Sequence, residues 1–442
     1  MAQVADRLQP WLATLDGRPR GGSRWLQDLR DAAASRFVEL GFPTVRDEEW
    51  RFTNVSPIAS SEFRPAPAAR VDGDALKAFV YADAPLRVVI VNGRFAPELS
   101  RTAGLPTGMR FGSLAAAASD HADVVGRYLG QLADAGSRAF AALNTAFTHD
   151  GAYVFVPDGA VIEPPLQLLF VSTGDPSQPP TISHPRSLIV AGDRSQVQIV
   201  ETYVSVPGAK HFTNAVTELV AGEGAIVDHY KVEEESTEAF HIASMHIHAA
   251  RASNVSTHAF TLGGRLVRND IIAVMDGEGA EATLNGLYLV DGDRLVDTHT
   301  TIDHAKPHCP SHEVYKGILG GNARAVFNGK IIVRQDAQKT DAKQTNRALL
   351  LSDHATINTK PQLEIFADDV KCTHGAAIGQ LDEDALFYLR TRGLPFAEAR
   401  DLLIHAFASE IIDRVRIEPL KQALETELYA QLARDLAEVD AA

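Results

Sequence analysis

Residues 153–171, YVFVPDGAVIEPPLQLLFV, hold two short apolar runs on either side of a Pro-Asp-Gly turn signal. The runs at 153–156 and 166–171 are rich in β-branched and aromatic residues, which favour strands, and the turn residues favour a reversal between them. The same pattern of strand and turn continues at residues 197–206, 225–232, 245–249, 255–262, 271–275 and 284–290. This part of the chain is therefore predicted to be almost entirely β.

Three all-β architectures fit such a pattern. Regular strands with glycine-marked turns and no long crossover segments are typical of a sandwich, a barrel or a β-solenoid. A strict hexapeptide or nonapeptide repeat would identify a solenoid, and no such repeat runs through these strands. The residues alone leave the three architectures open.

The hydrophobic period is helical on the N-terminal side of this core. Residues 23–40 carry apolar side chains at helical spacing, and Gly41 supplies a stop. The alanine-rich stretch 113–147 also favours helix. Between them, the apolar run 86–91 leads into Asn92-Gly93, which predicts a β-hairpin.

Helical patterning returns after about residue 375. Asp382 is predicted as a helix N-cap, Gly393 breaks the chain, and a last helix is expected over 418–439. Between these helices, one predicted apolar stripe consists of Ala399, Leu402, Leu403, Ala406, Phe407, Ile411 and Val415. The stripe either packs on its own domain or docks a partner.

Length and composition set independent limits. A chain of 442 residues exceeds what one core usually holds, and we expect a mainly helical region at 1–150, a β core at 151–375 and a helical region at 376–442. The net charge of -15 argues against nucleic acid or an anionic membrane as partner. Two cysteines exclude a disulfide framework and fit a reducing compartment. Residues 1–17 lack a secretory signal pattern, so the protein is expected to be soluble and cytoplasmic.

The stretch 361–375, PQLEIFADDVKCTHG, places Cys372 two residues before His374 at the end of a strand-like run. Residues i and i+2 of a strand face the same side, roughly 7 Å apart, so a thiolate and an imidazole would lie together. Zinc and cluster iron usually take four ligands, so the pair is half a site whose remainder comes from elsewhere, for example from another chain. The alternative is a buried cysteine beside a structural histidine.

Other patterns are weaker. Ten of the sixteen histidines lie between His211 and His312. A metal cluster is conceivable among His299, His304, His308, Cys309 and His312. These residues spread over several predicted strands, so core or surface histidines are the alternative. The glycine pattern at 277–282 precedes a strand and predicts a turn, because a phosphate-binding version must open a helix. Neither a Walker A sequence nor a G-x-S-x-G nucleophile motif is present.

Long segments nevertheless resemble one family. They are YKGIL at 315–319, VFNGKIIVRQDAQKTDAKQTNRALLLSDHATINTKPQLEI at 326–365, ADDVKCTHGAAIGQLDEDALFYLRTRGL at 367–394, EARDLLIHAF at 398–407 and, near the N-terminus, DEEWRFTNVSPI at 47–58. All are similar to the SufB/SufD family of iron–sulfur cluster assembly proteins. SufB members carry an EHEA-type motif where this chain reads CTHG, and a sulfur-accepting cysteine upstream. No cysteine lies between Cys309 and Cys372, so the chain is similar to the SufD branch.

The resemblance implies a right-handed β-helix, that is a β-solenoid, flanked by helical regions. It implies a non-enzymatic assembly component that pairs with a SufB-like scaffold and a SufC-like ATPase docked on the C-terminal helices, and that forms a homodimer when alone. Cys372 and His374 would be its metal ligands, with no cofactor bound stably alone and a transient iron–sulfur cluster in the complex. The alternative function is an all-β metal-dependent enzyme that uses the histidine-rich strands.

Overall fold

The computed structural model describes residues 11–81, 85–174, 177–206 and 208–439. The expectation that the chain begins without a secretory signal falls largely on residues 1–10, which lie outside the described residues.

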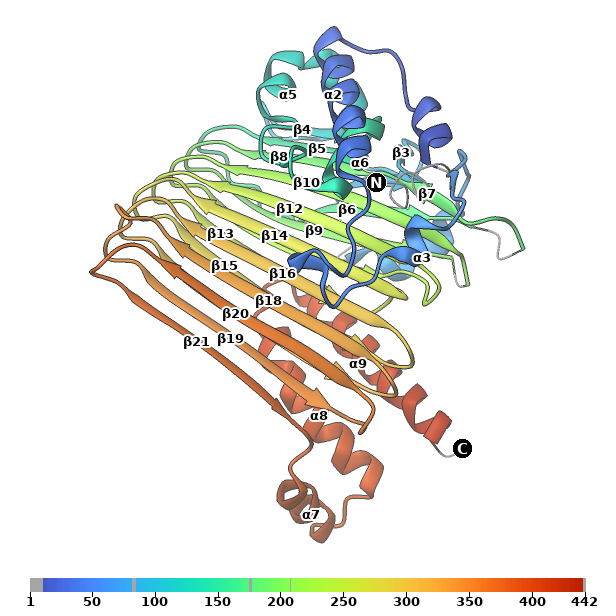
Figure 1. The fold of residues 1–442 in the computed structure, drawn as a ribbon, viewed down its shortest axis with the longest axis vertical. Helices are drawn as coiled ribbons and strands as arrows, with labels where there is room; N and C mark the ends of the chain where they lie inside the picture. Colours follow the sequence, from blue (N-terminus) through green and yellow to red (C-terminus); the bar gives the residue numbers. More distant parts are fainter. Residues whose placement is uncertain (1–10, 82–84, 175–176, 207, 440–442) are drawn as a thin grey trace.

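Two long sheets face each other along the molecule (Figure 1). Sheet A consists of β4 (Arg110–Ser113), β5 (Gly151–Val156), β8 (Arg186–Ala191), β10 (His211–Ala221), β12 (Phe240–Ala249), β14 (Leu266–Met275), β16 (Leu295–His304), β18 (Arg324–Val333) and β20 (Thr356–Ile365), with β1 (Arg64–Pro65) and β7 (Thr181–Ser183) beside them. Sheet B consists of β3 (Arg94–Phe95), β2 (Leu86–Val91), β6 (Leu166–Ser172), β9 (Gln196–Ser205), β11 (Ile226–Glu234), β13 (Asn254–Thr261), β15 (Glu281–Val290), β17 (Pro310–Leu319), β19 (Asp341–Leu350) and β21 (Lys371–Gly379).

From β8 onward the chain alternates between the two sheets. Each strand pairs in parallel with the strand two places further along the sequence, so β10 pairs with β12 and β11 with β13. This connectivity winds the chain into a β-solenoid of about seven turns. The predicted fold class, a β-solenoid between helical regions, is confirmed, and the sandwich and barrel alternatives are excluded.

The helices lie at both ends of the chain, as expected. They are α2 (Arg24–Leu40), α3 (Ser56–Ala59), α4 (Leu114–Asp120), α5 (Ala122–Tyr128), α6 (Ala139–Phe147), α7 (Glu383–Thr391), α8 (Phe396–Ile412) and α9 (Glu418–Val439), with 3-10 turns η1 (Glu48–Trp50) and η2 (Gly73–Phe79). The hairpin predicted at Asn92-Gly93 joins β2 to β3, and both turn residues have positive φ. None of the helices in the described part of the chain is both long and apolar enough to cross a bilayer.

Each helical region covers one outer face of the solenoid. Phe37 of α2 and Phe140 of α6 belong to an apolar cluster that includes Phe212 of sheet A. On the other side, Ile404 of α8 packs in a cluster with Tyr230 of sheet B. Figure 1 shows α2, α5 and α6 at one end of the molecule and α7 at the other. The predicted division at residues 150 and 375 stays a prediction.

The C-terminal stripe differs in part from the prediction. Ala399, Ile411 and Val415 are buried, whereas Leu402 is 46% exposed. Ile404, which the predicted stripe omitted, is fully buried against sheet B. The buried face of α8 is therefore rotated relative to the predicted one, and Leu402 lies on the free surface.

Inside the solenoid, large and small residues alternate between neighbouring turns. Tyr288 of β15 is in register with Gly317 of β17, and Gly286 of β15 is in register with Tyr315. A Cβ atom added at Gly317 would lie 2.1 Å from the Tyr288 ring. Each glycine thus makes room for the ring of the adjacent turn, and both tyrosines are almost completely buried.

The solenoid ends on an open edge. Among the described strands, β20 pairs only with β18 and β21 only with β19. Most residues of β21 are exposed. An edge strand presents unpaired backbone N–H and C=O groups, which makes it a template for pairing with another strand.

We predict that Gly317→Ala destabilises the protein, because the added methyl group would collide with the buried Tyr288 ring. Overpacking of this kind costs about 1–3 kcal/mol of unfolding free energy. Gly379→Ala is the matched control, since a Cβ at Gly379 of β21 meets no atom within 4 Å. Denaturant unfolding of the two variants checks the prediction, and equal midpoints would contradict it.

Candidate functional site

Cys372 and His374 lie on the last strand of the solenoid, β21. Their register partners on β19 are Ala342 and Gln344. Cys372 is partly buried against an interior cluster that contains Ala342, and His374 is exposed. The two side chains share one face of the strand, as the spacing predicts, because alternate residues of a strand point to the same side.

The Cys372 thiol is not activated in the isolated chain. Burial raises its pKa above the ordinary value of a cysteine, and the neighbouring Asp341 carboxylate raises it further. Another group, such as a metal ion that displaces the thiol proton, is therefore needed to deprotonate Cys372.

In the loop before β21, Asp369 makes structural contacts with the preceding turn. Asp369 forms an ion pair with Lys339, and the Lys339 backbone N–H donates to the Asp369 carbonyl at 2.7 Å. These contacts fix the start of the last strand next to the preceding turn. Asp369 thus shapes the strand end.

No group of three or more His, Cys, Asp or Glu side chains within the described ranges is arranged to hold a metal ion. The described surroundings of the Cys372 and His374 pair therefore contain no third candidate ligand. A tetrahedral metal site or a cluster site at this position would need further ligands from a second chain.

The other histidine-rich set does not converge. His304 faces the interior and hydrogen-bonds Ser311 through Nε2 at 3.0 Å, while Cys309 is fully buried near the Gly277 carbonyl. His308 occupies a turn with φ of 62°. His299 lies on the outer face of sheet A. The hypothesis of a second metal site gains no support from these positions.

Several histidines of the core instead pair with buried acids. Glu235 contacts His211 Nε2 at 2.9 Å and His241 Nδ1 at 2.7 Å. His229 Nε2 lies 3.1 Å from Glu201. All five side chains are buried in the solenoid interior, where an ionised group is tolerated only when paired. The enrichment in histidine therefore reflects a polar core.

The glycine pattern at 277–282 forms a turn that leads into β15, as predicted. A phosphate-binding loop requires a helix at this point, because the helix N-terminus holds the phosphate. The nucleotide alternative is excluded for this segment.

A second cluster of functional groups was missed by sequence reasoning. On the outer face of sheet A, Arg268 bonds Asp270 at 2.9 Å and Asp297 at 2.8 Å, and its guanidinium lies 3.8 Å from the centre of the Trp50 ring. His299 contacts Asp297 at 3.0 Å and Glu49 at 3.1 Å. We call these six residues the clasp, because they fasten the segment around η1 to the solenoid.

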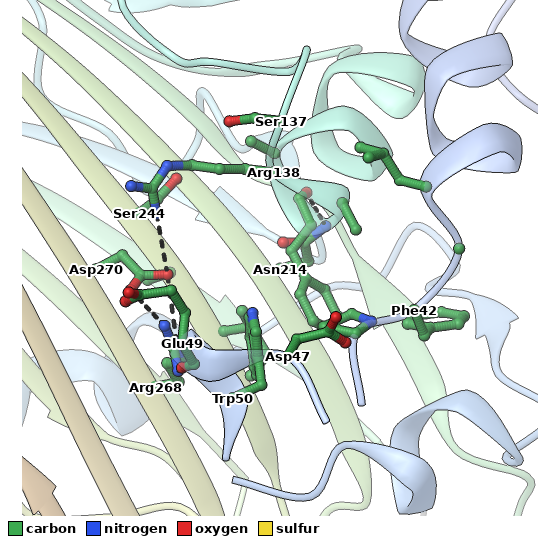
Figure 2. A pocket seen from close by; sticks show the side chains of 18 of the residues that line it. Phe42, Asp47, Glu49, Trp50, Ser137, Arg138, Asn214, Ser244, Arg268 and Asp270 are labelled. Atoms are coloured by element: carbon green, nitrogen blue, oxygen red, sulfur yellow. Dashed lines mark hydrogen bonds and ion pairs between the residues drawn. The ribbon is translucent and has the colours of Figure 1, made fainter. Parts of the chain in front are cut away.

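Figure 2 shows part of the clasp at the edge of a cavity of about 460 Å³ between η1, α6 and sheet A. Arg138 reaches over the cavity toward Asp270, at 3.8 Å. Residues of the segment 47–58 thus form one wall of this cavity. In the sequence, this segment stood out only by its resemblance to the family. No local pattern in the sequence connects Glu49 to His299.

The comparisons with known proteins agree with this architecture. The SufBD N-terminal region model matches residues 19–168, and the model of the SUF system FeS cluster assembly SufBD core domain matches residues 170–407. These matches define a component of iron–sulfur cluster assembly. The chain belongs to the SufBD family, because the two family models together cover most of it.

Individual relatives cover nearly the whole chain. An iron–sulfur cluster assembly SufBD family protein of Synechocystis is 38% identical over 90% of this chain and 89% of its own length. The iron–sulfur cluster assembly protein SufD of Escherichia coli is 31% identical over 88% of each chain. SufD of Bacillus subtilis is 27% identical over 90% of this chain and 92% of its own.

We predict a pH-dependent contribution of the clasp to stability. Burial lowers the pKa of His299, but the Asp297 and Glu49 carboxylates outweigh it and raise this pKa from 6.5 to about 9. A raised folded-state pKa means that the stabilisation is complete below pH 6.5 and is lost as the pH rises through about 9.

The measurement is unfolding free energy between pH 6 and pH 10 for wild type and His299→Gln. The wild type should lose stability over this interval relative to the variant. His354→Gln, a change of an exposed histidine, serves as the control. Parallel curves for wild type and His299→Gln would contradict the prediction.

Proposed function

We propose that this chain is a SufD-like, non-enzymatic component that pairs with a SufB-like scaffold and a SufC-like ATPase in a cytoplasmic complex. In that complex it lends Cys372 and His374 to a nascent iron–sulfur cluster at the interface with the scaffold. The observation that carries the proposal is the position of a two-ligand fragment on the open edge strand of the solenoid.

The open edge supports pairing with a second chain. Strand β21 has one paired side and one unpaired side, so a strand of a partner can extend sheet B. Pairing at this edge would bring the partner's ligands next to Cys372 and His374. The same edge would support a homodimer when the scaffold is absent.

The raised pKa of the Cys372 thiol fits an iron–sulfur cluster that is bound only transiently. A thiol with a raised pKa binds metal weakly, because the metal must displace a proton that is held more tightly than usual. The isolated chain is therefore expected to hold little iron. The cluster is stable only when ligands from both chains surround it.

The C-terminal helices offer a surface for the ATPase. Four large apolar side chains are exposed on α7 and α8, and exposed apolar surface often binds proteins. They are Phe387 and Tyr388 of α7 and Phe396 and Leu402 of α8. Figure 1 shows α7 at the same end of the molecule as β21, so a docked ATPase would lie near the edge that carries the ligands.

We predict that His374→Ala lowers the iron and sulfide content of the reconstituted complex without lowering its melting temperature. The imidazole is exposed, so its removal leaves no cavity. Thr373→Ala on the opposite strand face is the matched control and should keep full cluster content. Cys372→Ala is expected to behave like His374→Ala at a packing cost of about 1 kcal/mol. Unchanged cluster content in a well-folded double variant would remove both residues from the mechanism.

We also predict that Phe387→Ser weakens binding of the SufC-like ATPase. Phe387 is 68% exposed, so the change should leave the fold intact. Calorimetric titration of the chain with the ATPase measures the effect. Val161→Ser alters a residue of similar exposure, 58%, near the first turns of the solenoid and should leave the affinity unchanged. Equal affinities for both variants would place the docking surface elsewhere.

A further inference from the structure

Two buried polar residues continue the register position of His374 into the solenoid. His374 of β21 pairs with Gln344 of β19, and Gln344 pairs with Glu313 of β17. Gln344 is 2% exposed and Glu313 is 1% exposed. The three residues thus form a column that runs from an exposed imidazole at the open edge to a buried carboxyl group two strands away.

The three side chains belong to the interior face of sheet B. Cys372 packs against the interior cluster that contains Ala342 and Ile331. Gln344 and His374 each lie two residues further along the same strands, so they face the same side. Neighbouring strands are about 4.8 Å apart, which places in-register side chains in contact range.

Only one end of the Gln344 side-chain amide is hydrogen-bonded within the described residues. Its Nε2 donates to Glu313 Oε2 at 2.7 Å. Its Oε1 is buried and has no hydrogen-bond partner among the described residues. Because the amide nitrogen is directed at Glu313, the oxygen remains as a free acceptor, and a buried acceptor without a donor is unfavourable.

The backbone opposite Gln344 is adapted to its side chain. A Cβ atom added at Gly329 of β18 would lie 1.9 Å from Gln344 Nε2. Any other residue at position 329 would displace the amide. The glycine therefore leaves room for the Gln344 amide group beside Glu313.

A histidine that binds a metal through one ring nitrogen carries a proton on the other. That N–H usually donates to an acceptor, which fixes the tautomer and the ring plane. Gln344 Oε1 is a buried acceptor on the strand next to His374, and it needs a donor.

We propose that Gln344, oriented by Glu313, is a positioning residue that accepts the imidazole N–H of His374 and so presents the other ring nitrogen to iron. The inference rests on the proposed function, because it treats His374 as a ligand of the nascent cluster. It gives a structural reason for the hydrogen-bonded pair of Gln344 and Glu313 beside His374.

The test uses nuclear magnetic resonance of the full-length chain with isotope-labelled histidine, in which His374→Ala assigns the His374 signals. Wild type should show one neutral tautomer of His374. Gln344→Met keeps a similar volume but removes the acceptor, and it should give a mixture of both tautomers. Gln344→Glu keeps an acceptor oxygen at this position and should show one tautomer.

Asn346→Leu is the matched control. Asn346 is equally buried, two residues along β19, but its register partner on β21 is Ala376. This variant should leave the tautomer of His374 unchanged. In the reconstituted complex, loss of a residue that orients a ligand typically costs about 10–100-fold in metal affinity, so Gln344→Met should lower iron retention by about that factor.

The outcomes separate this inference from the proposed function. If His374→Ala leaves cluster content unchanged, the proposed function fails, whatever the tautomer. If His374→Ala lowers cluster content but Gln344→Met changes neither tautomer nor iron retention, only the role of Gln344 fails. A mixture of both tautomers in Gln344→Glu, which keeps an acceptor oxygen, would also overturn it, even if Gln344→Met does not fold.

Discussion

Parallel, in-register pairing between strands two places apart is the constraint on which the rest of the molecule depends. It holds from β8 to β21 and keeps the partners aligned over whole strands of about ten residues. Side chains of successive turns therefore form columns, and each column must be filled by residues that fit one another. The tyrosine–glycine pairs at 286–288 and 315–317 are the steric form of this requirement.

The same constraint explains where the site lies. Interior columns can contain polar groups only where neighbours in the column satisfy them, as Gln344 of β19 does for its register partner Glu313 of β17. At the last turn a column has no further neighbour, so Cys372 and His374 are left with free coordinating atoms beside an unpaired edge. Under the proposed function, a partner chain supplies the remaining ligands at this edge. This is consistent with a family that builds iron–sulfur clusters.

Local patterns predicted most of the secondary structure and the placement of Cys372 and His374 on one strand. Alternation and turn residues identified the strands, and the i, i+2 spacing was sufficient to place Cys372 and His374 on one face. The choice of a solenoid needed the family resemblance. Phe240, Leu266, Leu295, Arg324 and Thr356 occupy one column at uneven sequence spacing, so no fixed repeat marks the turns.

Contacts between residues far apart in the chain could not be predicted from the sequence. Glu49 and His299 are 250 residues apart, and their contact follows from how the N-terminal segment lies on sheet A. The position of Gln344 beside His374 depends on the register between β19 and β21, which a strand pattern does not reveal. In α8, an apolar period alone did not tell which face meets sheet B, and Leu402 was placed on the wrong side.

The most direct test of the central claim is hydrogen–deuterium exchange of the backbone amides in β21, alone and with the SufB-like partner. If a second chain completes the site by pairing with the open edge, amides of β21 that point away from β19 should become protected on mixing. Amides of β15, inside the solenoid, should not change. A complex that forms while the exchange of β21 stays as fast as in the isolated chain would contradict the account.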